Sequence, residues 1–586
     1  MKQNTHSSLI VLSALFFGAS AYATNVLIPT ETLPTETGDY TIYYSGSDAS
    51  TVVGIDTSKT SYTPIKLTFA SGDVDGNTYI SPKNWEMNGN HTFNLTSNSA
   101  NQVILQNNTG CMVKVKGSIT VNRAENVESS DNAYAVIEMG NSRFYTEGTP
   151  IININANTKI NSAYTTDAIY IGRKTKLNVA SNAKLEINGK TKLEGANKSG
   201  DTFAHLSIST GSSATFNDEF KIQQYGDIVS NGDLIINQDT TWTVGSSSKI
   251  TVGTTGSIDV KNTGASIGGS LVDISGNFTT NGDTTFKNSD VVVQTDANFN
   301  VSNGLLTVDG GSLTINGSLN RTVGSAKTKI INGAVVTATK LNQGSGQTIT
   351  IGAISDNESS LVISGTNDYY QLQVYGYLIQ ESGNARFIRS ATFYNGSNLI
   401  MNGDITLYNK NITDFNNSAS TSLIINDGAN VSFSGNLYMQ NARLMLKKEN
   451  ALGTDAKIFL NSNSTKALLD LDASQEFDTI TADTKTLEID IAQNVVLNAS
   501  FVSENNGRFI VFNFTDNQIK LKNATDISDV NTIFQAYSSS DMSQKIDSLY
   551  ITSDGWLAMA TVPEPAEWAF ILGALALGIT IYRRRK

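Results

Sequence analysis

The chain is dominated by short segments in which two apolar residues flank one polar residue. Such segments lie at 299–301, 306–308 and 313–315, where the first apolar residue recurs every seven positions. This alternation is typical of β-strands, because successive side chains of a strand point to opposite faces. Each segment is too short to be stable alone, so we expect many segments to share one hydrophobic core.

Residues that favour turns separate these segments. Similar fragments recur and end in Asn or Asn-Gly, at 185–189, 234–237, 399–403 and 423–426. Gly and Asn tolerate the positive φ that sharp corners require. Two or three segments with their corners make a coil of about 20 to 25 residues, a length typical of solenoids. We expect parallel coils about 4.8 Å apart, with Asn side chains forming ladders between them.

The distribution of proline agrees with continuous strand pairing. No proline occurs between residues 151 and 562, and proline would remove a hydrogen bond from a paired strand. The sequence therefore predicts an all-β fold, an elongated right-handed parallel β-helix with β caps. In texture it resembles the β-helix passengers of bacterial surface proteins, especially the autotransporter-like ones, although it ends in a helix-length apolar run and not in barrel strands. Tandem antiparallel β-sandwiches remain the alternative.

Changes in pattern suggest the domain boundaries. Residues 24–110 contain four of the seven prolines and are expected to form an N-terminal β cap, followed by solenoid repeats over 111–445. Regularity falls after residue 445, so 446–560 is expected to form a C-terminal β cap. Caps are needed because open solenoid ends expose unpaired strand edges.

The N-terminus has the pattern of an export signal. Lys2 precedes an apolar run over 9–19, and Ala21 and Ala23 are spaced as in a signal-peptidase site. Residues 1–23 are therefore predicted to be a signal peptide that the export machinery recognises. An uncleaved N-terminal anchor is the alternative.

The C-terminus combines three features within residues 561–586. Pro563, Glu564 and Pro565 precede an uncharged run over 568–582, and Arg583, Arg584, Arg585 and Lys586 follow. A helix over 568–582 would extend about 22 Å, somewhat less than the ~30 Å membrane core. Side chains that extend toward the interface can make up the difference, so we predict a single transmembrane helix with the cations in the cytoplasm. A buried C-terminal helix is the alternative.

This tail resembles that of PEP-CTERM proteins, in which Pro-Glu-Pro, an apolar helix and an Arg-rich end occur in this order. The resemblance implies processing by an exosortase, a membrane-embedded transpeptidase-like enzyme, and release or attachment at the cell surface. Pro563, Glu564 and Pro565 would then be recognition residues. Both prolines fix φ and lack a backbone donor, which favours an extended segment that an enzyme can bind.

Composition argues against several function classes. The net charge of −12 disfavours nucleic acid as a partner. With three His and one Cys, Cys111, we expect no metal centre, no cofactor and no catalytic triad. The segment 73–77 lacks calcium-loop spacing and is expected to be a turn. The acidic residues Asp470, Asp472, Glu476 and Asp478 are expected to lie on the solvated surface.

The segment 369–377 is the most aromatic part of the chain. On a regular strand, Tyr369, Tyr375 and Tyr377 would share one face with Gln371 and Gln373. Tyrosines can pack on sugar rings while amides bind hydroxyls, so the three tyrosines are candidate carbohydrate contacts. Packing along the solenoid is the alternative.

Together these patterns predict a non-enzymatic, exported structural or adhesive protein of the cell surface or extracellular matrix. It would carry a sorting tail and a membrane anchor that is either transient or permanent. The alternative function is binding or degradation of an extracellular polysaccharide.

Overall fold

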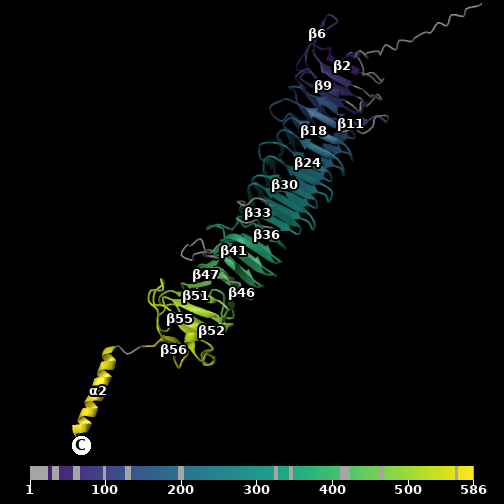
Figure 1. The fold of residues 1–586 in the computed structure, drawn as a ribbon. Coiled ribbons are helices and arrows are strands. Elements are labelled where there is room, and N and C mark those ends of the chain that lie inside the picture. Colours follow the sequence, from purple (N-terminus) through teal and green to yellow (C-terminus); the bar gives the residue numbers. More distant parts are fainter. Residues whose placement is uncertain are drawn as a thin grey trace, which may run out of the picture. The chain divides into compact units, whose positions relative to one another are not determined.

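The computed structural model describes residues 24–28, 39–56, 66–96, 100–125, 133–195, 203–321, 327–341, 347–408, 423–460, 467–560 and 565–584. The chain divides into an N-terminal unit, residues 1–221 with 225–227, and a C-terminal unit, residues 222–224 with 228–586. In both units short strands stack as successive coils (Figure 1).

The N-terminal unit contains two parallel sheets, named A and B here. Sheet A consists of β1 (Thr24–Ile28), β2 (Asp39–Tyr44), β4 (Lys66–Ala70), β9 (Gln102–Asn107), β12 (Ala135–Glu138), β15 (Thr158–Asn161), β18 (Lys184–Asn188) and β21 (Ser213–Phe216). Sheet B consists of β3 (Val52–Asp56), β7 (Asn84–Asn88), β8 (Asn90–Leu95), β10 (Met112–Val115), β11 (Ser118–Arg123), β13 (Phe144–Thr146), β14 (Ile151–Ile154), β16 (Ile169–Ile171), β17 (Lys176–Val179), β19 (Thr191–Leu193) and β20 (Ala204–Ile208). Strands β22 (Phe220–Ile222) and β23 (Gly226–Ser230) lie at the boundary between the units along the chain.

The C-terminal unit has the same two kinds of strand. Its sheet A strands are β24 (Asp233–Ile236), β27 (Ser257–Val260), β30 (Asn277–Asn281), β32 (Asn298–Ser302) and β34 (Ser318–Arg321). The first part of its sheet B consists of β25 (Trp242–Val244), β26 (Lys249–Val252), β28 (Ala265–Gly268), β29 (Leu271–Ile274), β31 (Thr284–Val293), β33 (Leu305–Ile315), β35 (Lys327–Ile331), β36 (Val335–Ala338), β37 (Thr348–Ile351), β38 (Ser360–Ile363), β39 (Asn367–Val374), β40 (Tyr377–Gln380), β41 (Ala385–Phe393) and β42 (Asn398–Met401).

Sheet B of this unit continues beyond the end of sheet A. These strands are β43 (Ile405–Tyr408), β44 (Leu423–Ile425), β45 (Asn430–Phe433), β46 (Asn436–Gln440), β47 (Ala442–Leu446), β48 (Lys457–Leu460), β49 (Ala467–Leu471), β50 (Gln475–Asp483), β51 (Thr486–Ile491), β52 (Leu497–Glu504), β53 (Arg508–Phe512), β54 (Ile519–Leu521) and β55 (Phe534–Ala536). After β34, the described coils are therefore built from sheet B strands.

The pairing register confirms the predicted solenoid. Phe278 pairs with Phe299, and Phe299 pairs with Leu319, always in parallel. Side chains of neighbouring coils in this region hydrogen-bond across 20 to 22 residues of sequence, within the predicted coil length. Leu306, Val308, Leu313 and Ile315 are at most 1% exposed, whereas the polar residues between them are half-buried or exposed. Because the strands pair in parallel, the alternative of antiparallel sandwiches is wrong.

Asparagine ladders form between coils, as predicted. Asn161 donates to Glu138 at 2.8 Å, Asn188 donates to Asn161 at 2.8 Å, and Asn217 donates to Asn188 at 2.8 Å. Many non-glycine corners with positive φ are also asparagines, such as Asn303, Asn332 and Asn441. These amides satisfy one another because the same position recurs in each coil.

The two segments that are expected to be caps contain parallel coils. Residues 24–110 already form parallel coils, since β1 pairs with β2 and β3 pairs with β7. An antiparallel hairpin interrupts them, formed by β5 (Gly72–Val74) and β6 (Asn77–Tyr79), and residues 75 and 76 form its turn as expected. Most of 446–560 also continues as parallel strands up to β55. Parallel coils are compatible with the lower regularity of these two segments, because coils tolerate long insertions at their corners.

The C-terminal end of the coils does contain non-solenoid elements. These are η2 (Ala524–Asp526), α1 (Val530–Ile533) and the antiparallel pair β56 (Leu549–Ile551) and β57 (Leu557–Met559). Helix α2 (Pro565–Arg584) follows, and its side chains at 569–584 are all exposed. Among the described residues, we find no helix with the length and apolarity needed to cross a membrane.

A buried arginine marks the end of sheet A. Arg321 is the last residue of β34 and is 6% exposed. Its Nη2 donates to the carbonyls of Gly304 at 2.6 Å and Lys327 at 3.0 Å. Burial lowers the pKa of the Arg321 guanidinium to about 10, despite the opposing effect of Asp283.

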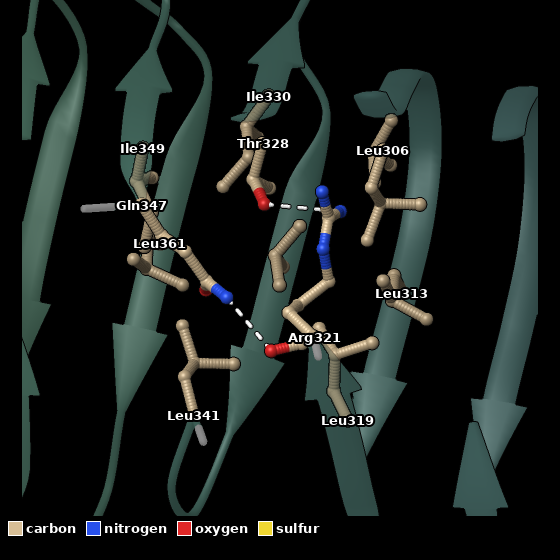
Figure 2. Close-up of a pocket in the computed structure, with 12 residues that line it drawn as sticks. Leu306, Leu313, Leu319, Arg321, Thr328, Ile330, Leu341, Gln347, Ile349 and Leu361 are labelled. Atoms are coloured by element: carbon tan, nitrogen blue, oxygen red, sulfur yellow. Dashed lines mark hydrogen bonds between the residues drawn. The ribbon is translucent and has the colours of Figure 1, made fainter. Parts of the chain in front are cut away.

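Figure 2 shows Arg321 pointing among leucine and isoleucine side chains of the coil interior. The cavity beside it has a volume of about 20 Å³, which is enough for one water molecule. This cavity is therefore too small for a ligand, and Arg321 acts as a structural element that binds carbonyls where sheet A stops.

Candidate functional site

The predicted tyrosine face is divided by an irregularity in β39. Tyr369 pairs with Phe387, but Gln371 pairs with Ser390, so the register shifts between Tyr369 and Gln371. Tyr370 and Gln371 are both half-buried while Tyr369 is 1% exposed. The prediction of Tyr369 as a carbohydrate contact is therefore wrong, because strict alternation fails at a bulge.

Tyr369 instead belongs to the core. Its ring stacks on that of Phe387 at 5.4 Å, and its hydroxyl donates to Gln380 Oε1 at 3.0 Å. Gln380 is itself buried and donates to the carbonyl of Ser382 at 2.6 Å. Burial raises the pKa of Tyr369 well above its ordinary value, so it stays a neutral hydrogen-bond donor.

The other two candidate tyrosines, Tyr375 and Tyr377, are half-buried. The ring of Tyr375 stacks on that of Tyr394 with 4.2 Å between centroids and an interplanar angle of 2°. Tyr377 begins β40, where the buried Leu378 follows it. Tyr375 and Tyr377 remain candidate carbohydrate contacts.

One of the four acidic residues that are expected on the solvated surface, Asp470, is buried in the structure. Asp470 is 7% exposed and is not part of the solvated surface. Arg443 donates through Nε to Asp470 Oδ2 at 3.0 Å. Burial raises the pKa of Asp470, although the charge of Arg443 opposes this effect. The pairing of β47 with β49 places the two residues together, and local sequence does not show this pairing.

The N-terminal unit contains a site that sequence reasoning missed. Its centre is an outward ladder on sheet B in which Lys114 pairs with Tyr145, Tyr145 with Tyr170, and Tyr170 with Lys192. In β13 the neighbours of Tyr145, Phe144 and Thr146, are buried, so the half-buried Tyr145 faces outward. One residue from each of four coils therefore contributes to a continuous row.

The two tyrosine rings of this row stack on each other. Their centroids are 4.3 Å apart and their planes differ by 5°. Arg143 lies 5.8 Å from the Tyr145 ring centroid, and Lys192 lies 5.6 Å from that of Tyr170. Because these groups occupy the ring faces, the row offers mainly its ring edges to a ligand.

Tyr170 is further fixed by a carboxylate. Its hydroxyl donates to Glu194 Oε2 at 3.2 Å, and Lys192 forms an ion pair with the same carboxylate at 2.7 Å. Burial and then the charge of Glu194 raise the pKa of Tyr170 above its ordinary value. The phenol therefore stays protonated near neutral pH and keeps this hydrogen bond.

The turn after β16 is held by a buried hydroxyl. Gly172 donates its backbone N–H to Thr146 Oγ1 at 2.7 Å, and the Thr146 and Thr175 hydroxyls lie 2.8 Å apart. Thr175 also donates its N–H to the Gly172 carbonyl at 3.1 Å. A Cβ at Gly172 would come within 2.8 Å of the Thr146 carbonyl, so only glycine fits this close approach.

This turn presents two cations to solvent. Arg173 and Lys174 are both exposed, and Lys174 has a positive φ of 59°. Over the part of the chain that the structure describes, neither forms an ion pair. By contrast, Lys221 of the same unit is paired with Asp167 at 3.5 Å.

These elements enclose a groove of about 650 Å³. Its walls are the tyrosine pair, the turn with Arg173 and Lys174, and the segment after β13, and it is lined by Tyr145, Thr146, Glu147, Gly148, Thr149, Tyr170, Arg173 and Lys174. The volume is typical of a small-molecule or oligomer site. The groove therefore combines phenols, threonine hydroxyls, one carboxylate and two exposed cations.

Sequence reasoning overlooked this groove because its residues come from different coils. Tyr145 and Tyr170 look like single aromatics in the sequence, and only the coil register brings them together. The one local signal was the adjacent pair Arg173-Lys174 beside a glycine.

The predicted sorting residues are only partly described. Ala21, Ala23, Pro563, Glu564 and Arg585 lie outside the described residues. Pro565 begins α2, and Arg583 and Arg584 lie in its last turn, where cations interact favourably with the helix dipole.

The side chains that could bind a metal ion are scattered over the described residues. The described ranges contain no group of three or more His, Cys, Asp or Glu side chains placed to hold a metal ion. The single cysteine, Cys111, is half-buried, and burial raises the pKa of its thiol. Its sulfur lies 2.7 Å from Thr109 Oγ1.

Comparison with known proteins identifies no family. No protein-family model and no curated protein matches this chain. Among solved structures, the chain is similar to a TibA fragment, residues 55–350, that was hyper-glycosylated by TibC. The match has 14% sequence identity and a TM-score of 0.19, and it covers 69% of this chain and 99% of that fragment.

Proposed function

We propose that the protein is an exported structural or adhesive component of the cell surface or extracellular matrix. In this proposal the coils present a polar surface to the outside of the cell and have no catalytic role. In the described coils, apolar side chains fill the interior and Asn, Thr and charged residues form the exterior. Such coils bury their core continuously and leave the outside free to vary.

We further propose that residues 561–586 are a sorting tail. This proposal rests on the exposed apolar side chains of α2, which no other described part of the chain covers. Phe570 is 77% exposed, Leu572 is 62% exposed and Leu577 is 65% exposed. Exposed apolar surface of this extent needs a membrane or a protein partner. An exosortase-type enzyme would act near Pro563, Glu564 and Pro565 while α2 holds the chain at the membrane.

Replacement of Pro563, Glu564 and Pro565 by alanine tests the sorting tail. We expect the variant to remain in the membrane fraction with α2 still attached, because the recognised segment is gone. Mass spectrometry of both mature termini measures this directly. A matched control replaces Ser548, Thr552 and Asp554, outside the tail, and should be processed normally. Processing of the tail variant at the same position as the unmodified protein would refute the assignment.

A test with polysaccharides addresses the non-catalytic role. The purified protein is incubated with acidic and neutral polysaccharides, and chain lengths are followed by size-exclusion chromatography. We expect no shortening of any polymer. Depolymerisation that is lost on heat unfolding would contradict a structural role.

A further inference from the structure

The groove beside Tyr145 and Tyr170 has features that a purely structural surface does not need. Its turn is fixed by the buried Thr146 hydroxyl, and two cations on that turn form no ion pair within the described chain. Several strand lysines of the N-terminal unit do form ion pairs, such as Lys159 with Glu186 at 2.8 Å and Lys192 with Glu194 at 2.7 Å. Two neighbouring exposed cations that line one groove, on a protein of net charge −12, favour an anionic ligand there.

We propose that this groove binds an anionic polysaccharide. The proposal rests on the proposed function only for the location of the polymer outside the cell. Arg173 can bind a carboxylate or sulfate through two parallel N–H bonds, and Lys174 adds a second positive charge. The remaining lining supplies hydrogen-bonding groups for sugar hydroxyls, namely the exposed Glu147 and Thr149.

The geometry favours a saccharide over a nucleic acid. Bases bind single-strand sites by stacking on open aromatic faces. Here the faces of Tyr145 and Tyr170 cover each other at 4.3 Å, and Arg143 and Lys192 lie close to the same two rings. The ring edges remain, and their C–H groups suit the mixed C–H and hydroxyl surface of a sugar.

The charged side chains that line the groove determine where a polyanion would be attracted. Glu147 is paired with Lys114 at 3.1 Å, so its carboxylate is partly neutralised at the groove wall. Arg173 and Lys174, for which no ion pair occurs among the described residues, line the same groove from the turn that follows β16. A polyanion that the acidic protein repels elsewhere would thus be attracted at one position, and the interaction would weaken with salt.

The test measures binding of defined oligosaccharides to the full chain. Oligogalacturonate, sulfated dextran oligomers and neutral dextran oligomers are titrated by isothermal calorimetry at low and physiological salt. We expect binding of at least one of the two anionic oligomers and no binding of the neutral one. The two anionic probes distinguish a carboxylated ligand from a sulfated one.

Two double variants show whether the groove is responsible. Arg173→Gln/Lys174→Gln should weaken binding by about tenfold or more. Lys249→Gln/Lys287→Gln changes the net charge equally at exposed positions outside the groove, and it should bind as the unmodified protein does. Circular dichroism checks that both variants are folded. An equal loss in both variants, or no loss in the groove variant, would overturn the proposal.

Lysine acetylation provides a second measurement that needs no variant. The bound oligomer should protect Lys174 from the reagent and leave Lys249 fully reactive. Absence of binding by both anionic oligomers, or tighter binding of a single-stranded oligonucleotide at the same groove, would also overturn the proposal. Neither result depends on the processing of the C-terminal tail, so failure here and failure of the sorting proposal are distinguishable.

Discussion

The replacement Gly264→Ala tests how closely successive coils approach. A Cβ at Gly264 would lie 1.7 Å from the carbonyl oxygen of Asp283 in the next coil, and 2.4 Å from its carbonyl carbon. Real Cβ atoms essentially never come within 3.0 Å of another heavy atom, so the backbones must separate by about 1.3 Å. The φ of Gly264 is not in the left-handed region, so this contact alone demands glycine.

The cost follows from the bonds that such a separation strains. The backbone N–H of Trp242 donates to the Gly264 carbonyl at 3.0 Å, and the backbone N–H of Gly269 donates to the Lys287 carbonyl at 2.7 Å. Overpacking costs about 1 to 3 kcal/mol, and each weakened ladder bond adds about 1 kcal/mol at most. We therefore expect Gly264→Ala to lower the free energy of unfolding by about 3 kcal/mol.

Gly268→Ala is the matched control in the same stretch of chain. A Cβ there would meet only the Val244 carbonyl, at an ordinary 3.8 Å. Because glycine inside a strand is unfavourable, this variant should be neutral or more stable by about 0.5 kcal/mol. Urea unfolding followed by the fluorescence of the buried tryptophans, with hydrogen exchange at 265–268 and 284–287, measures both variants. Equal stability of the two variants would refute the stacking of Gly264 on Asp283.

Two further predictions concern polar groups at the coil corners. Burial opposes ionisation of Asp356, but bonds from the Ser359 hydroxyl and three backbone N–H groups together lower its pKa below 3.8. Because the pKa of Asp356 is lower in the folded state than in the unfolded state, its carboxylate stabilises the folded protein. This stabilisation is complete at pH values above the unfolded pKa of 3.8, and it is lost as the pH falls through the folded pKa. Asp356→Asn should therefore be less stable by about 1 kcal/mol at pH 7, and pH-dependent urea unfolding should show the difference closing in acid. Asn188→Ala removes two ladder bonds of 2.8 Å and should cost about 1 kcal/mol in the same assay, whereas Ser207→Ala should cost little. A smaller loss for Asn188→Ala than for Ser207→Ala would contradict a stabilising ladder.

Much of the fold could be predicted because it repeats. Alternation within 299–315 identified the buried residues correctly, and the Asn-rich corners predicted both the coil length and the amide ladders. In a solenoid each coil contacts its neighbours, so local pattern and tertiary contact carry the same information.

The remaining features depend on contacts between coils that the sequence does not show. The register shift at Tyr369 moves one tyrosine into the core, and the pairing of β47 with β49 places Arg443 beside the buried Asp470. Arg321 is buried where sheet A ends, a position that has no local signal. The groove at Tyr145 and Tyr170 likewise exists only through the coil register.

Cysteine labelling of intact cells tests the central claim, that the coils lie outside the cell. Ile354 is 93% exposed, and Cys111 is the single native cysteine. Cells that produce the Cys111→Ser/Ile354→Cys variant are treated with a maleimide that cannot cross membranes. One sample is treated while the cells are intact, and a second sample is treated after lysis. The account predicts the same labelling in intact and lysed cells. Labelling that occurs only after lysis would contradict it.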